Sequence, residues 1–67
     1  MNKNNMFKTD VKLSGIDGNV YTIFAACIKS ARRNNITQEQ VDIFIKEAKI
    51  GDYDHVLRTC YKYFEVS

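Results

Sequence analysis

Residues 20–33, VYTIFAACIKSARR, carry the pattern that decides the fold. Apolar side chains recur in this segment at the spacing i, i+3, i+4, i+7, i+8 and i+11, at Val20, Ile23, Phe24, Cys27, Ile28 and Ala31. This spacing places them along one side of an α-helix, which buries that side against the rest of the protein. Either Asp17 or Asn19 can cap the first turn with a side-chain oxygen, and Asn34-Asn35 is expected to end the helix.

Two later segments also predict amphipathic helices. Thr37 and Gln40 have the spacing of a capping box at the start of the second helix, and Gly51 is expected to stop it. The apolar stripe of this helix is Val41, Phe44, Ile45 and Ala48. Asp52 is expected to cap the third helix, which repeats the spacing of the first with Tyr53, Val56, Leu57, Cys60, Tyr61 and Phe64.

Short segments at both ends of the chain predict strands. Apolar and polar side chains alternate over residues 7–13, which indicates a half-buried strand, and turn-forming residues follow it. Residues 64–67 also alternate, and a strand needs a partner within the chain. We therefore predict a mostly helical α+β fold, β-α-α-α-β, in which residues 11–14 and 64–67 form a small two-stranded antiparallel sheet. The alternative is an all-α three-helix bundle with an N-terminal extended arm.

The length and composition restrict the class of protein. With 67 residues, we expect a flexible N-terminus at residues 1–6 and a single small domain at residues 7–67. Ten basic and eight acidic residues are too balanced to require a nucleic-acid partner. No apolar run matches a secretory signal or a membrane helix. We expect no membrane association and a location in the cytoplasm.

No catalytic or metal site is expected. Cys27 and Cys60 sit in the middle of apolar stripes, where cysteine is an ordinary core residue. His55 is the one histidine, and it falls on a different face of its helix from Cys60. Asp52 and Asp54 suit the start of that helix, where carboxylates cap it and complement its dipole. We therefore predict a protein that is not an enzyme and has no cofactor.

Two segments are candidates for ligand binding. Residues 15–19 run from a strand into a helix, and backbone N–H groups at a helix start can hold an anion. Lys29, Arg32 and Arg33 cluster within about one helical turn and, with Lys8 and Lys12, can form a basic patch for phosphates. The predicted ligand-binding or partner-binding residues are Gly15, Asp17, Gly18, Asn19, Tyr21, Lys29, Arg32 and Arg33.

Apolar side chains outside the predicted stripes point to association with other chains. Tyr21, Ile43 and Tyr63 lie at or beyond the edges of their helical stripes, and contiguous exposed aromatic side chains mark interfaces. A single small layer of helices also leaves part of the wide apolar side of residues 20–33 uncovered. We therefore predict a homo-oligomer.

Several segments together resemble short uncharacterised open reading frames of bacteriophages and mobile elements. They are VKLSG at residues 11–15, DGN at residues 17–19, GDYDHVL at residues 51–57 and YFEV at residues 63–66. The resemblance implies a small non-enzymatic phage accessory protein, in the cytoplasm of a bacterial host, that blocks or sequesters a host component. With the candidate binding residues above, our first hypothesis is that it binds a host protein or sequesters a small phosphate-bearing ligand, and in that way inhibits a host defence system. The resemblance transfers no catalytic residue. The alternative is a small nucleic-acid-binding regulator, although Arg58 and Lys62 are the only cations expected on the third helix.

Overall fold

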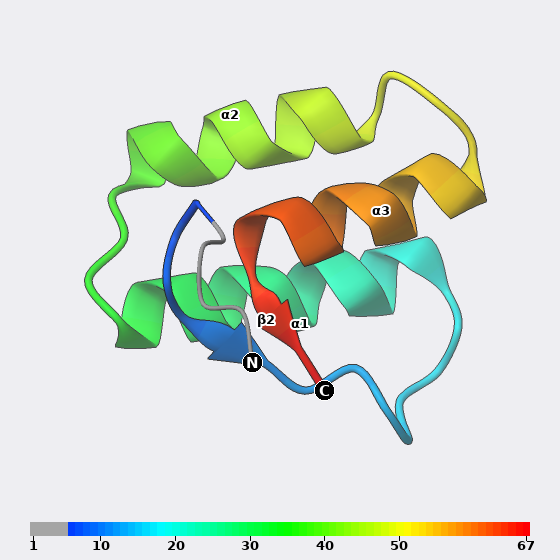
Figure 1. Ribbon diagram of the computed structural model, residues 1–67, viewed down its shortest axis with the longest axis horizontal. Coiled ribbons are helices and arrows are strands. Elements are labelled where there is room, and N and C mark those ends of the chain that lie inside the picture. The colour runs from blue at the N-terminus through cyan, green and yellow to red at the C-terminus, as the bar shows by residue number, and fades with distance from the viewer. Residues whose placement is uncertain (1–5) are drawn as a thin grey trace.

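The computed structural model describes residues 6–67, and within them the predicted order of elements is present. The chain forms β1 (Asp10–Val11), α1 (Val20–Arg33), α2 (Gln38–Ala48), α3 (Tyr53–Tyr63) and β2 (Glu65–Val66). Each helix contacts the other two, β1 packs on α1, and β2 follows directly from α3 (Figure 1). The prediction of a mostly helical fold with a two-stranded sheet is confirmed, whereas the all-α alternative is not.

The sheet is parallel, so the predicted antiparallel pairing is wrong. Asp10 lies opposite Glu65, and Val11 lies opposite Val66. Figure 1 shows the reason: the chain reverses direction at each connection from β1 through the three helices to β2, so that β2 again runs along β1. Parallel strands require such a long crossover.

The strand at residues 7–13 is shorter than predicted, although its alternation is real. Thr9 and Val11 are buried, whereas Lys8 and Asp10 are exposed. Lys8 has a φ of 52°, which interrupts extended backbone on the N-terminal side of β1. A flexible N-terminus was predicted for residues 1–6. Residues 1–5 lie outside the described part of the chain. The backbone N–H of Met6 donates a hydrogen bond to the carbonyl oxygen of Lys62 at 3.0 Å.

The helix starts follow the predicted capping chemistry. Asn19 caps α1, because its side-chain oxygen accepts the backbone N–H of Tyr21 at 2.8 Å. The capping box of Thr37 and Gln40 is present at the start of α2. Asp52 caps α3 by accepting the backbone N–H of His55 at 3.0 Å. These bonds satisfy donors that would otherwise have no partner in the first helical turn.

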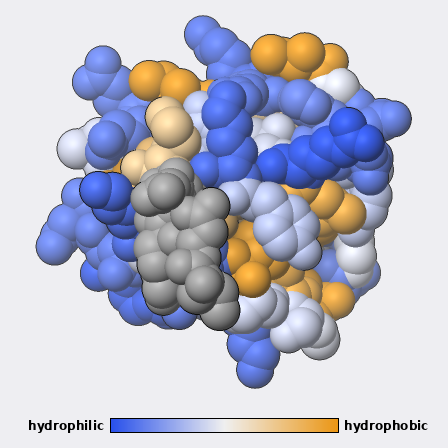
Figure 2. All heavy atoms as spheres, viewed as in Figure 1, coloured by the Kyte–Doolittle hydropathy of each residue, from blue (hydrophilic) through white to orange (hydrophobic). Residues whose placement is uncertain are grey.

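An aromatic cluster fills the space between the helices and the segments around Phe7 and Phe64. Its rings pack at centroid distances of 5.0–6.3 Å and belong to Phe7, Phe24, Phe44, Tyr63 and Phe64. Tyr63 is only 4% exposed, which corrects the expectation that it lies at the edge of its helix. Tyr61, assigned to the apolar stripe, is 65% exposed instead. The buried side of α3 is thus rotated toward Thr59 and Tyr63. On the face drawn in Figure 2, by contrast, hydrophilic residues predominate and hydrophobic residues are exposed in separate places.

Candidate functional site

Helix α1 carries Tyr21, Lys29, Arg32 and Arg33 of the predicted binding residues, and the loop at residues 15–19 precedes it. Its inner side is held by the core, and Ser30 on that side donates a hydrogen bond from its hydroxyl to the backbone carbonyl of Asp10. Its outer side presents Tyr21, Ala25 and Lys29, which are exposed at i, i+4 and i+8. The helix contains three cationic residues, Lys29, Arg32 and Arg33, and no acidic residue.

The C-terminal half of α1 borders a groove with an apolar floor. Two shallow hollows of about 640 and 340 Å³ lie here, and Ala25, Lys29 and Arg33 line both. We call the two hollows together the cationic groove; their lining residues are Val11, Lys12, Thr22, Ala25, Ala26, Ile28, Lys29, Ser30, Arg32 and Arg33. Two alanines and an isoleucine give it an apolar floor between long cationic side chains.

The cations around this groove have no acidic partner within residues 6–67. They are Lys12, Lys29, Arg32 and Arg33. By contrast, Arg58 pairs with Asp54 at 2.9 Å, and Lys62 pairs with Glu47 at 2.7 Å. The structure therefore brings Lys12 to the predicted cluster, but Lys8 is not among the lining residues.

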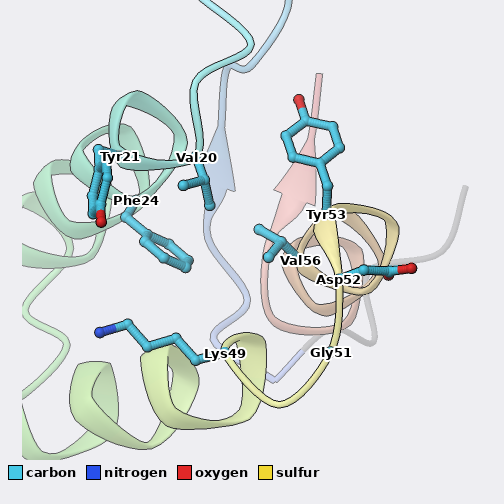
Figure 3. Close-up of a pocket in the computed structure, with 8 residues that line it drawn as sticks. All are labelled: Val20, Tyr21, Phe24, Lys49, Gly51, Asp52, Tyr53 and Val56. Carbon is cyan, nitrogen blue, oxygen red and sulfur yellow. The ribbon is translucent and has the colours of Figure 1, made fainter.

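A second groove lies at the other end of α1. It has a volume of about 510 Å³ and joins the start of α1, the loop after α2 and the start of α3 (Figure 3). We call it the tyrosine groove; its lining residues are Val20, Tyr21, Phe24, Lys49, Gly51, Asp52, Tyr53 and Val56. Figure 3 shows Tyr21 and Phe24 projecting from α1 on one side and Tyr53 and Val56 from α3 on the other.

Sequence reasoning found Tyr21 but missed the rest of the tyrosine groove. Tyr53 was assigned to the buried stripe of α3, yet it is 47% exposed. Its hydroxyl lies close to Gly18: a Cβ added at Gly18 would be 3.5 Å from the hydroxyl oxygen of Tyr53. Because the groove combines residues from three separate elements, no local sequence pattern identifies it.

Two side chains of the loop at residues 15–19 form hydrogen bonds with backbone N–H groups of the loop and of the first turn of α1. Asp17 accepts the backbone N–H of Asn19 at 3.2 Å, and Asn19 in turn accepts that of Tyr21. Gly15 has a φ of 81°, a conformation that favours glycine. Gly15, Asp17, Gly18 and Asn19 are not among the lining residues of either groove. The rise of an α-helix places this loop about 20 Å from Arg32 and Arg33, so the predicted site separates into two.

The two cysteines and the one histidine make their contacts within the fold. Cys27 and Cys60 are free thiols, each 0% exposed. The imidazole Nε2 of His55 lies 2.9 Å from the carbonyl oxygen of Glu47. Within residues 6–67, no group of three or more His, Cys, Asp or Glu side chains could hold a metal ion.

Neither helix length nor similarity to known proteins identifies a function. None of the helices in the described part of the chain is both long and apolar enough to span a membrane. No protein-family model, curated protein or solved structure matches this chain. The resemblance to phage and mobile-element reading frames stays a prediction, and the functional argument rests on the two grooves.

Proposed function

We propose that this protein is a non-enzymatic binding protein that holds a small phosphate-bearing ligand in the cationic groove. The observation that carries the proposal is the set of four cations at one apolar-floored groove, with no acidic partner among residues 6–67. Exposed like charges repel each other, and a polyanion that binds between them removes that repulsion.

The groove suits a ligand with both a phosphate and an apolar part. Arg32 and Arg33 offer planar guanidinium groups, which bind phosphate oxygens with two parallel hydrogen bonds. Ala25 and Ile28 offer a surface on which a ring of nucleotide size can lie. The two hollows, at about 640 and 340 Å³, fall in the size range of small-molecule sites.

Sequestration is the biological role that follows from binding without catalysis. In a protein of phage or mobile-element type, located in the cytoplasm of a bacterial host, it would withdraw a phosphate-bearing signal and so inhibit a host defence system. Binding of a host protein through the same cationic surface is the alternative. A nucleic-acid regulator is less well supported, because both cations of α3, Arg58 and Lys62, pair with carboxylates of the same chain.

An NMR titration tests the proposal directly. With ATP and inorganic pyrophosphate as probes, we expect backbone amide shifts confined to α1 and to Lys12. Substituting Arg32→Ala together with Arg33→Ala should weaken binding by about tenfold or more, because each charge-assisted hydrogen bond contributes about 1.5–3 kcal/mol. The double variant Lys46→Ala, Arg58→Ala changes the net charge equally and should bind like the natural chain. Equal affinity in both double variants would remove the cationic groove from the account.

A further inference from the structure

Two thiols that the proposed ligand site does not use meet in the core. Cys27 lies in α1 and Cys60 lies in α3, and they are the only cysteines in the sequence. Their sulfur atoms are 3.8 Å apart, and both thiols are free and buried. The fold therefore brings two thiols from different helices into contact away from solvent.

This contact is close to the geometry of a disulfide. An S–S bond is about 2.05 Å long, so the two sulfur atoms have to approach each other by less than about 2 Å. Small rotations of both side chains about their Cα–Cβ bonds can supply this movement. The two cysteines are 33 positions apart in the chain, so a bond between them closes a long loop and removes many conformations from the unfolded chain.

We propose that Cys27 and Cys60 form a reversible disulfide that links α1 to α3 and stabilises the fold. The core of a domain with 67 residues is marginal, and a covalent cross-link is one of the ways in which small domains gain stability. The bond joins the first helix of the chain to the last. Under reducing conditions the same two sulfurs pack as thiols, so the chain has two folded forms that differ in stability.

A small disulfide such as oxidised glutathione is the oxidant. When the core opens, the thiolate of one cysteine attacks a sulfur of oxidised glutathione, which forms a mixed disulfide and releases one glutathione thiolate. The thiolate of the second cysteine attacks the protein sulfur of the mixed disulfide and releases the second glutathione thiolate. The two cysteine protons pass to the released thiolates, so one oxidised glutathione becomes two reduced glutathiones. Because both thiols are buried, opening of the core limits the first step.

The disulfide is independent of the proposed ligand site. Cys27 stands between Ala26 and Ile28, which line the cationic groove, but its own side chain belongs to the core. The bond should form with or without a phosphate-bearing ligand. Its failure would leave the proposed function standing, and a failure of ligand binding would leave the disulfide standing.

Equilibration of the full chain in glutathione buffers tests the proposal. Intact-mass spectrometry after acid quenching separates the dithiol, the mixed disulfide and the internal disulfide, which lacks the mass of two hydrogen atoms. We expect the effective concentration of one thiol toward the other to be at least about tenfold higher in the folded chain than in concentrated urea, because the fold holds the sulfurs together. By linkage, the oxidised chain should unfold at a higher urea concentration than the reduced chain.

Two precautions separate the disulfide from other effects. Each equilibrium is approached from the reduced chain and from chain that was oxidised in urea and then refolded, so slow opening of the core does not hide the result. Cys27→Ala and Cys60→Ala are each compared with themselves in oxidising and reducing buffer, so a loss of core packing affects both curves, and oxidation should not raise their urea midpoints.

Three results would each overturn the proposal. The first is an effective concentration in the folded chain that is equal to or below that in urea. The second is an oxidised natural chain that unfolds at the same or a lower urea concentration than the reduced chain. The third is an equal rise of the urea midpoint on oxidation of either single-cysteine variant.

Discussion

The sulfur atoms of Cys27 and Cys60 lie 3.8 Å apart, where α1 packs against α3 in the core. They come from residues 33 positions apart in the chain, so their contact depends on the complete fold. The hydrogen bond between them and their burial raise the pKa of the Cys27 thiol far above its ordinary value. Cys27 is therefore a protonated core side chain.

Burial of both thiols predicts slow alkylation of the native protein. Iodoacetamide reacts with exposed thiolates, and both side chains are 0% exposed. We expect labelling at least about 100-fold slower than in concentrated urea, since reaction has to wait for an opening of the core that costs several kcal/mol. Mass spectrometry at timed intervals measures it, and rapid labelling of the folded protein at either cysteine would contradict the packing described here.

Gly51 is required by close packing and not as the stop of α2. The helix already ends at Ala48, and a Cβ added at Gly51 would lie 2.7 Å from the Cβ of His55. Gly51→Ala should lower the free energy of unfolding by about 1–3 kcal/mol, because the backbone has to shift. Gly18→Ala is the matched control, since its nearest contact would be an ordinary 3.5 Å. Equal urea-unfolding curves for the two variants would contradict this explanation.

The fold was predictable where the signals are local. Apolar spacing located α1, and the side-chain oxygens of Thr37 and Asp52 located the starts of α2 and α3. Strand direction was not predictable from local patterns, because it depends on how often the chain reverses between β1 and β2. The buried side of α3 was also misjudged, since the packing of Tyr63 against α2 decides the rotation of that helix.

The candidate site was only partly predictable. Lys29, Arg32 and Arg33 lie together because they share one helical segment. Lys12 joins them through the packing of β1 on α1, a contact that the basic spacing alone does not establish. The prediction that residues 15–19 belong to the same site as Arg32 and Arg33 did not take the length of α1 into account. The loop lies at the N-terminus of this helix and the two arginines lie at its C-terminus.

The capping box predicts a measurable contribution to stability. Thr37 accepts the backbone N–H of Gln40 at 3.2 Å, and the side chain of Gln40 accepts the backbone N–H of Thr37 at 3.2 Å. Thr37→Ala should cost about 1 kcal/mol of unfolding free energy. Thr37→Ser keeps the hydroxyl and should unfold at nearly the same urea concentration as the natural chain. If serine and alanine are equally destabilising, the hydroxyl is not the stabilising group.

A buried tyrosine and a carboxylate predict the pH dependence of stability. The hydroxyl of Tyr63 donates to Glu47 at 2.6 Å, and this bond raises the pKa of Tyr63 from 10.0 to about 12. The contribution of Tyr63 is therefore complete below pH 10 and is lost as pH rises toward 12. The hydrogen bonds from Lys62 and Tyr63 lower the pKa of Glu47 below 4.5, so its contribution is lost as pH falls below that value.

Tyr63→Phe isolates this interaction. We expect a loss of about 1–2 kcal/mol at neutral pH, because a charge-assisted hydrogen bond is removed. We also expect a smaller decline in stability between pH 10 and 12 than in the natural chain. Tyr61→Phe is the control, since Tyr61 is 65% exposed. Identical alkaline unfolding profiles for Tyr63→Phe and the natural chain would show that the bond does not contribute.

Native mass spectrometry of the protein purified gently from bacterial cells tests the central claim most directly. It reports the subunit number and any retained ligand together. We predict an added mass of nucleotide size on the natural chain and its absence from the Arg32→Ala, Arg33→Ala variant, with the control Lys46→Ala, Arg58→Ala retaining it. An added mass that survives in the arginine variant, or a natural chain that carries none, would contradict the assignment of a phosphate-bearing ligand to the cationic groove.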